Sequence, residues 1–249
     1  MDVAPHLLLL AGAGEAREIA ARLAGKSDMR VTASLHYPER AFGPLAVPTR
    51  IGGFGGESGF EAYLNAQSIT AVLDATHPFA VNVSTRSCRV CARTGLAYAQ
   101  VLRPEWDRQS GDHWVDIADE SAAAGVIPSG KRVFVTTGRA TLAQFQGLHS
   151  ARLFVRQLTD SPHRIEMKNT TYVRGTAPFS VDQEISLFRE LEIEWLVTRN
   201  SGGRENRTKI DAARALGIPV AMIRRPMQPE STKLTSVQAA LDWVAALCR

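Results

Sequence analysis

Short apolar runs alternate along the chain with segments whose apolar residues recur at helical spacing. His6–Ala11 is an almost continuous apolar run that ends at a glycine, and Gly14–Leu23, which follows it, has apolar residues every three or four positions. A run of this length is typical of a buried strand, whereas the longer spacing predicts a helix with one buried face. Residues 31–35 and Ala71–Ala75 form the next two predicted strands.

The same alternation continues toward the C-terminal end. The pattern predicts a helix over about 79–93 and a strand over 96–102. Further strands are predicted over 132–136, 153–158, 195–198 and 220–223, and further helices from about 140, over 181–192, over 208–216 and from about 236. Strands that alternate with helices favour an α/β fold in which parallel sheets are covered on both faces.

The alternation restarts near residue 129, after the turn-forming triplet Pro128-Ser129-Gly130. We therefore expect two Rossmann-like lobes, over 1–128 and 131–249, each a parallel sheet flanked by helices. We also expect the active site in the cleft between them, because ligands of such sheets bind beyond the carboxyl ends of the strands.

Composition narrows the class of protein. The chain of 249 residues is 45% hydrophobic and 22% charged, and its net charge is +4, with 29 basic and 25 acidic residues. The basic residues are scattered, which argues against a nucleic-acid-binding stripe. No apolar stretch is long enough for a membrane span, and 7–11 is too short for the core of a signal peptide, so we expect a cytoplasmic protein.

The chain has three cysteines, which suits a reducing compartment. Cys88 and Cys91 form a CxxC pair, but they fall inside a predicted helix with no second pair or histidine cluster nearby. Zinc and redox sites need more partners than this, so we predict a structural role for both cysteines and no metal site.

A glycine-rich turn joins the first predicted strand to the first predicted helix. Gly12 and Gly14 match the first two positions of GxGxxG, while Arg17 occupies the third. Free backbone N–H groups at such a turn can bind the pyrophosphate of a dinucleotide, although a tight turn alone would also need glycine. The predicted cofactor-binding residues of this turn are Gly12, Ala13, Gly14, Glu15 and Ala16.

The end of the second predicted strand bears on the choice of cofactor. An NAD site usually has an acidic residue there, whereas an NADP site has hydroxyl and basic groups for the additional phosphate. Ser34, His36, Tyr37 and Arg40 lie in this region, and Glu39 is its only acidic residue. We therefore predict that Ser34 and Arg40 bind NADPH; the alternative is that these are ordinary exposed loop residues.

Two further segments are predicted to lie against the cofactor. In the run IGGFGG over 51–56, Gly53, Phe54 and Gly55 form a loop whose glycines suggest close backbone approach. In DATHPFA over 74–80, at the end of a strand, Pro78 is expected in the first helical turn, with Thr76 or His77 as the cap. The site residues here are Thr76, His77, Pro78 and Phe79, and His77 is also a candidate proton donor.

The second half of the chain repeats the arrangement of strand, glycine-rich loop and helix in 197–203, a second candidate anion site. Arginine matches a carboxylate with two parallel hydrogen bonds, so several arginines at strand ends predict a substrate with several carboxylates, although each one taken singly suits a solvated surface charge. The predicted substrate-binding residues are Arg103, Arg139, Arg174, Arg199, Asn200, Ser201, Gly202, Gly203 and Lys209.

These motifs together resemble the precorrin-6A reductase family of cobalamin biosynthesis. The resemblance covers nearly the whole chain, in order, and rests on GGFGG at 52–56, DATHPFA at 74–80, RPEW at 103–106, TTGR at 136–139, RGTAPF at 174–179, RNSGG at 199–203 and KIDAAR at 209–214. The sequence departs from the family at AGAGEA, where the family commonly has GGT before Glu-Ala, at Arg199, where lysine is frequent, and at 204–207.

The resemblance implies an NADPH-dependent enzyme that reduces one double bond of the precorrin-6A macrocycle to give precorrin-6B. It implies an NADPH-binding lobe over 1–128, a substrate-binding lobe over 131–249, and arginines that hold the acetate and propionate groups of the tetrapyrrole. We expect a monomer or small homo-oligomer. The alternatives are a reductase of the cobalt-containing analogue and a non-enzymatic dinucleotide sensor. Short-chain dehydrogenases are excluded, because no tyrosine has a lysine four residues later.

Overall fold

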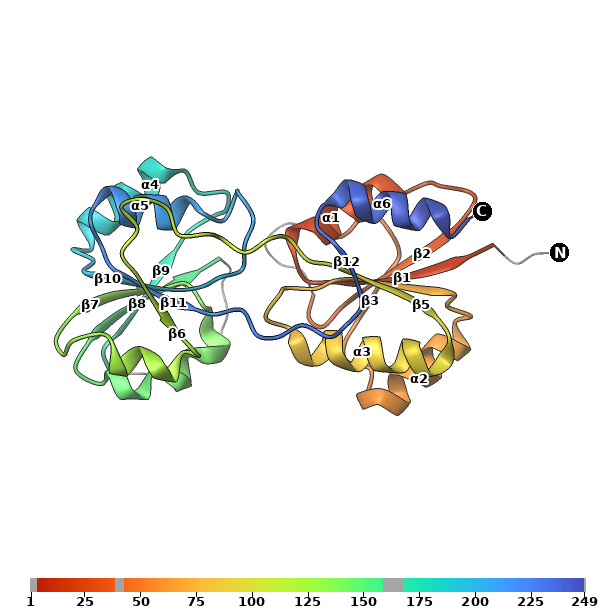
Figure 1. Cartoon of the computed structure of the whole chain (residues 1–249), viewed down its shortest axis with the longest axis horizontal. Coiled ribbons are helices and arrows are strands. Elements are labelled where there is room, and N and C mark those ends of the chain that lie inside the picture. Colours follow the sequence, from red (N-terminus) through yellow and green to blue (C-terminus); the bar gives the residue numbers. More distant parts are fainter. Residues whose placement is uncertain (1–3, 39–42, 159–167, 249) are drawn as a thin grey trace. The chain divides into compact units, whose positions relative to one another are not determined.

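The computed structural model describes residues 4–38, 43–158 and 168–248. The chain forms two compact units, one made of Met1–Pro104 with Pro226–Arg249 and the other of Glu105–Arg225. Each unit contains a six-stranded sheet in which every pair of neighbouring strands is parallel, with helical segments on both faces (Figure 1). The predicted α/β fold with two Rossmann-like sheets is confirmed.

The two units do not coincide with the expected division at 128–131. The strand β6 (Trp114–Ile117) pairs with β11 (Val220–Ile223) in the second sheet, so the second unit starts before the Pro128-Ser129-Gly130 turn. The strand β12 (Thr232–Leu234) pairs with β5 (Ala97–Val101) and returns the C-terminal segment to the first unit. Strand pairing between distant segments decides this division, and the order of elements along the chain does not reveal it.

The first sheet has the strand order β12-β5-β4-β1-β2-β3. Its remaining strands are β1 (His6–Ala11), β2 (Arg30–Leu35), β3 (Thr49–Ile51) and β4 (Ala71–Ala75). One face is covered by α1 (Gly14–Leu23) and α6 (Val237–Ala246), and the other by α2 (Gly56–Ala66) and α3 (Val81–Thr94) (Figure 1).

The central strand β1 explains why its sequence is apolar at consecutive positions. Leu7 and Leu9 belong to the core cluster that includes α1 and α6, whereas Leu8 and Leu10 belong to the cluster that includes α2 and α3. Successive side chains of a strand point to opposite faces, so a sheet that is covered on both faces requires apolar residues at every position.

The second sheet has the strand order β6-β11-β10-β7-β8-β9. Its remaining strands are β7 (Arg132–Val135), β8 (Arg152–Gln157), β9 (Thr170–Arg174) and β10 (Trp195–Arg199). The helices are α4 (Val181–Glu190) and α5 (Thr208–Ala215), on one face, with the 3₁₀ segments η1 (Ser121–Gly125) and η2 (Arg139–Leu148) on the other (Figure 1). The helix expected from about 140 is therefore a 3₁₀ helix.

The four strands that the hydrophobic pattern did not predict, β3, β6, β9 and β12, are the four edge strands of the two sheets. An edge strand is short and partly exposed, so it lacks the continuous apolar run by which the central strands are recognised. The helix α2 was also missed, because its first turn follows a run of glycines. No helix within the described ranges is long and apolar enough to cross a bilayer.

One tight contact in the first unit generates a stability prediction. Gly59 lies in α2, where a Cβ atom would overlap the backbone carbonyl of Phe54. Replacing a helical glycine by alanine normally stabilises a protein by about 1 kcal/mol, but overpacking costs about 1–3 kcal/mol. We expect Gly59→Ala to lower the free energy of unfolding in a urea titration.

The matched control is Gly125→Ala in η1, where a Cβ atom would meet nothing within 4 Å. Its free energy of unfolding should stay the same or rise by up to about 1 kcal/mol. Equal stability of Gly59→Ala and the wild-type chain would contradict the predicted clash.

Candidate functional site

The strand order of each sheet reverses at one central pair of strands, β1 with β4 in the first unit and β7 with β10 in the second. Ligands of open α/β sheets bind beyond the carboxyl ends of the strands at such a switch point. In the first unit the loops after β1 and β4 are in contact: Ala13 N–H donates to the carbonyl of Ala75 at 3.1 Å. A Cβ atom on Gly12 would lie 3.4 Å from Cα of Thr76.

The glycine-rich turn leads directly into α1. Ala13 is the N-cap residue, its backbone is extended, and no side chain caps the helix there. The backbone N–H groups of the first helical turn therefore have no side-chain acceptor at the start of the helix. A pyrophosphate site requires N–H groups of this kind. Arg17, at the third position of the incomplete fingerprint, bonds through its guanidinium to the carbonyls of Gly43 and Pro44.

Glu15 and Arg103, predicted for different ligands, form an ion pair. The Nη1 atom of Arg103 lies 2.8 Å from both carboxylate oxygens of Glu15, and both side chains are largely buried. The pair joins the first turn of α1 to the segment that follows β5. Arg103 thus lies at the same edge of the first sheet as the glycine-rich turn, and Glu15 neutralises its charge.

The predicted cofactor residue Ser34 is bonded to Arg50, a residue that was not predicted to belong to the site. Ser34 lies opposite Arg50 in the register of β2 and β3, and Arg50 Nη1 donates to Ser34 Oγ at 2.8 Å. The same guanidinium donates to the carbonyls of Gly52, at 2.8 Å, and Gly53, at 2.9 Å. A basic residue two positions before GGFGG is the signal that could have identified Arg50. Arg40 lies outside the described residues.

The GGFGG loop is shaped by this arginine. Gly52, Gly55 and Gly56 have φ of +110°, +79° and +88°, which only glycine adopts readily. The guanidinium carbon of Arg50 lies 3.9 Å from the centre of the Phe54 ring, a stacked cation–π contact. These torsion angles explain why glycine occupies three positions of the loop, whereas its close approach to a cofactor stays a prediction.

Asp74 stabilises the loop after β4 by hydrogen bonds. Its side chain is fully buried in the strand, where Oδ1 accepts from Thr76 N–H at 3.0 Å and from Thr76 Oγ1 at 2.7 Å, and Oδ2 accepts from Tyr98 at 2.8 Å. Burial, followed by the charge of Asp74 and the hydrogen bond to it, raises the pKa of Tyr98, so the phenol remains a donor. An acidic residue inside an apolar strand was the sequence signal for this network.

The expected capping of the following helix is wrong. α3 begins at Val81, its N-cap residue is Ala80, and no side chain caps it, so neither Thr76 nor His77 does so and Pro78 precedes the first turn. Thr76 bonds instead to Asp74, because a buried carboxylate needs donors more than the exposed helix end needs an acceptor.

His77 and Phe79 face each other across Pro78. The Nδ1 atom of His77 accepts from the backbone N–H of Phe79 at 3.2 Å, so a neutral ring carries its proton on Nε2. The carbonyl of Pro78 accepts from Gln228 at 2.9 Å, and Gln228 also bonds to Gln100 of β5. The loop is therefore held in place by the C-terminal segment.

Cys88 and Cys91 lie in α3 as free cysteines. Burial raises the pKa of both thiols, that of Cys91 to about 12, so both remain protonated at neutral pH. This state is consistent with the predicted structural role. No group of three or more potential ligand residues that could bind a metal ion occurs within the described residues.

In the second unit, the loops after β7 and β10 carry most of the predicted substrate-binding residues. Thr136 Oγ1 donates to Thr198 Oγ1 at 2.8 Å, which links the two strands where the loops start. Arg139 follows Gly138, whose φ of +84° turns the chain into η2. Arg199 pairs with the buried Glu120, whose Oε1 lies 2.6 Å from Nη2 of the arginine.

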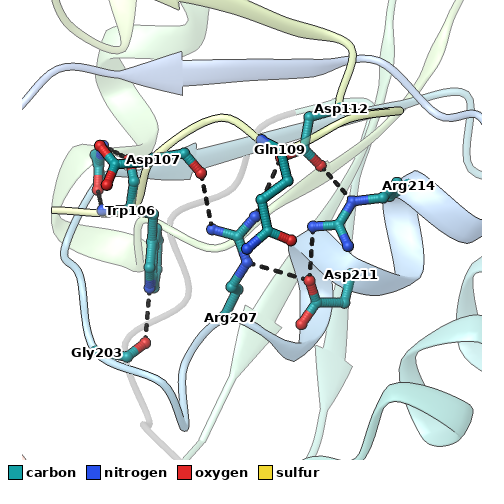
Figure 2. A network of polar contacts seen from close by, with 9 residues as sticks. Trp106, Asp107, Gln109, Asp112, Gly203, Arg207, Asp211 and Arg214 are labelled. Carbon is teal, nitrogen blue, oxygen red and sulfur yellow. Dashed lines mark hydrogen bonds and ion pairs between the residues drawn. The ribbon is translucent and has the colours of Figure 1, made fainter.

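The RNSGG loop is fastened to the RPEW segment by Asn200 and Trp106. The amide of Asn200 accepts from Trp106 N–H at 2.8 Å and donates to the carbonyl of Trp106 at 3.0 Å. The indole N–H of Trp106 donates to the carbonyl of Gly203 at 2.7 Å (Figure 2). The side chain of Asn200, predicted to bind substrate, thus fixes the backbone of the loop.

A network of charged residues extends this anchor to α5 (Figure 2). Asp112, whose side chain is 1% exposed, accepts from Arg207 Nη2 at 3.1 Å and from Arg214 Nε at 2.8 Å. Asp211 accepts from the same two arginines at 3.2 and 2.9 Å. Arg207, which lies in the stretch where the sequence departs from the resembled family, therefore holds the segment before β6 against α5.

The structure groups the predicted residues into two sets. The loops after β1, β2, β3, β4 and β5 bring together the turn 12–16, Ser34, 53–55, 76–79 and Arg103 at the carboxyl edge of the first sheet. The corresponding edge of the second sheet holds Arg139, Arg174 and 199–203. Lys209 lies in the first turn of α5, with Nζ 5.1 Å from the centre of the Trp106 ring.

Comparison with known proteins agrees with this arrangement. The model of the family described as precorrin-6x reductase CbiJ/CobK matches residues 6–245. The chain is 39% identical to the precorrin-6A reductase of Rhodococcus erythropolis, over 98% of this chain and 99% of the relative. It is 27% identical to the cobalt-precorrin-6A reductase of Methanothermobacter thermautotrophicus, over 88% of this chain and 76% of the relative.

A solved structure supports the same assignment. The structure titled CobK precorrin-6A reductase superposes with a TM-score of 0.90 at 32% identity and covers 97% of this chain and 96% of its own. Sequence and fold thus agree over nearly the entire length. The chain belongs to the precorrin-6x reductase CbiJ/CobK family.

Proposed function

We propose that this chain reduces one double bond of precorrin-6A with NADPH, giving precorrin-6B, and that it does so in the cytoplasm. The observation that carries the proposal is the combination of family membership over residues 6–245 with a Rossmann-type switch point at which Gly12, Ala13 and Thr76 meet. NADPH supplies a hydride, so the chain's task is to hold two ligands in register and to deliver a proton.

The first unit offers the groups that a dinucleotide phosphate needs. The start of α1 has no side-chain cap at Ala13, so a pyrophosphate can approach the backbone N–H groups, and Gly12 lets this turn lie against Thr76. Ser34 and Arg50 lie at the end of β2 and β3, where the adenine ribose of such a cofactor is bound. The residues present therefore fit NADPH.

The second unit supplies cations for the carboxylates of the macrocycle. Arg174 is the last residue of β9, Arg139 begins η2 after the loop that follows β7, and the Arg199–Glu120 pair limits the charge that Arg199 contributes. Ser201, Gly202 and Gly203 add neutral donors on a backbone that Asn200 and Trp106 hold fixed. Prearranged donors of this kind bind an anionic ligand with little loss of conformational entropy.

The metal-free macrocycle is the favoured substrate over its cobalt-containing analogue. The precorrin-6A reductase of Rhodococcus erythropolis is 39% identical to this chain, whereas the cobalt-precorrin-6A reductase of Priestia megaterium is 29% identical to it.

The first prediction concerns the reaction. The purified chain should oxidise NADPH when precorrin-6A is present and should do so more efficiently than it oxidises NADH. Absorbance at the NADPH band, followed side by side with the metal-free and cobalt-containing macrocycles, measures both preferences. No NADPH consumption with either macrocycle would refute the proposed function.

The second prediction concerns His77. Its Nε2–H is the donor that the neutral ring retains, and general acid catalysis contributes about a hundredfold or more to a rate. His77→Ala should therefore lower kcat about a hundredfold. His149→Ala, an exposed histidine after η2, is the control. Near-normal turnover of His77→Ala would dismiss the histidine as proton donor.

The third prediction concerns the substrate carboxylates. Arg174 is exposed at the end of β9, and a lost charge-assisted hydrogen bond costs about 1.5–3 kcal/mol, or at least about tenfold in binding. Arg174→Gln should raise the KM for precorrin-6A by this factor with an unchanged KM for NADPH. Arg189→Gln, exposed in the last turn of α4, should change neither. A rise in both constants would point to a general loss of structure.

A further inference from the structure

Two arginines of the first unit face one aromatic ring. The guanidinium carbon of Arg50 lies 3.9 Å from the centre of the Phe54 ring, and that of Arg86, in α3, lies 5.4 Å from the same centre. Arg86 also lies 5.0 Å from the centre of the Phe60 ring. Neither arginine forms an ion pair with a described residue. Two like charges are thus gathered around one side chain of the GGFGG loop.

The neighbouring carboxylates are engaged elsewhere. Asp74 accepts hydrogen bonds from Thr76 and Tyr98, and Glu57 forms ion pairs with Arg89, at 2.6 Å, and Arg93, at 3.4 Å. Burial lowers the pKa of Arg86 below its usual value, and the charge of Arg50 adds to this, although Asp74 and Glu57 oppose the shift through space without a direct bond to the arginine. The positive charge at Phe54 therefore has no directly bonded counter-ion among the described residues.

Both arginines also have N–H donors without a partner among the described residues. The Nε atom of Arg86 is buried and has no hydrogen-bond partner, which is costly unless a ligand supplies one. Arg50 makes three hydrogen bonds to described residues, and a guanidinium has five N–H groups, so two of its donors remain. A purely structural role in holding the loop explains the three bonds of Arg50 but does not explain a second cation beside it.

The position of this cluster in the fold identifies the anion. Ser34, bonded to Arg50, is the second-last residue of β2, and in dinucleotide-binding sheets this strand end selects between a free ribose hydroxyl and a 2′-phosphate. A phosphate carries up to two negative charges and several acceptor oxygens, which matches two guanidinium groups and a hydroxyl. We infer that Arg50, Ser34 and Arg86, arranged around Phe54, bind the 2′-phosphate of NADPH.

This inference rests on the proposed function, and it assigns the selection of NADPH over NADH to Arg50 and Arg86. It requires no contribution from Arg40, the basic residue that the sequence alone indicated. The two arginines come from β3 and α3, and the Phe54 ring lies within reach of both.

Isothermal titration calorimetry with two mononucleotides tests the assignment without turnover. Adenosine 2′,5′-bisphosphate carries the 2′-phosphate, and 5′-AMP lacks it. Wild-type protein should bind the bisphosphate more tightly. Arg50→Gln and Arg86→Gln should each weaken its binding about tenfold or more, the loss of one charge-assisted hydrogen bond, and leave 5′-AMP unchanged. Arg22→Gln, an exposed residue of α1 paired with Glu18, should change neither affinity.

The outcomes separate the inference from the proposed function. If the wild-type chain prefers the bisphosphate and both variants retain that preference, the assignment of Arg50 and Arg86 is wrong while NADPH remains the cofactor. If both variants lose affinity for the two mononucleotides equally, the arginines are structural and the assignment is also wrong. If the wild-type chain binds neither mononucleotide, the NADPH proposal and the assignment fail together.

Because Arg50 also holds the glycine-rich loop, the Arg86 variant provides the more direct test. Its side chain packs against rings and its buried Nε atom has no partner, so its replacement should not lower the thermal midpoint of unfolding. The kcat/KM ratio of NADPH to NADH should fall about tenfold in the same variant. An unchanged ratio would overturn the role of Arg86.

Discussion

The parallel pairing of β1 with β4 is the constraint on which the proposed nucleotide site of the first unit depends. It sets Ala11 opposite Ala75, so the glycine-rich turn and the loop containing Thr76 and His77 leave the sheet side by side. The contact is close enough that Gly12 lies against Thr76. Pairing of β1 with β2, and of β2 with β3, then adds Ser34 and the GGFGG loop to the same edge. Motifs separated by more than sixty residues become one surface because parallel strands present their carboxyl ends together.

In both units, buried charged side chains hold loops in place. Some of them are stabilised by hydrogen bonds from neutral groups and others by ion pairs. In the first unit Asp74 is solvated by Thr76 and Tyr98, and Glu15 neutralises Arg103. In the second unit Asp112 receives two arginines. Breaking one partner of such a group leaves an uncompensated buried charge, which is far more costly than the pair's net contribution. These groups therefore fix the positions of the loops, while their net contribution to the free energy of unfolding is small.

Several side chains that were predicted to contact ligands have partners within the protein. Asn200 bonds to the backbone of Trp106, Arg199 pairs with Glu120, and Glu15 pairs with Arg103. Their motifs lie on loops at the carboxyl edges of the two sheets, where ligands bind in this class of fold. Whether a polar side chain faces a ligand or supports the loop depends on neighbours that come from distant segments, such as Trp106 for Asn200. A single sequence does not reveal those neighbours.

The sequence by itself determined the alternation of buried strands and helices, the parallel central sheets, the glycine-rich turns and the family to which the motifs belong. All of these depend on local periodicity or on short fixed spacings. Only the tertiary structure decided the edge strands β3, β6, β9 and β12, the return of the C-terminal segment to the first unit, and the meeting of Arg50 and Arg86 at Phe54. These features arise from pairing and packing between residues far apart in the chain, and such contacts leave no periodic signal in the sequence.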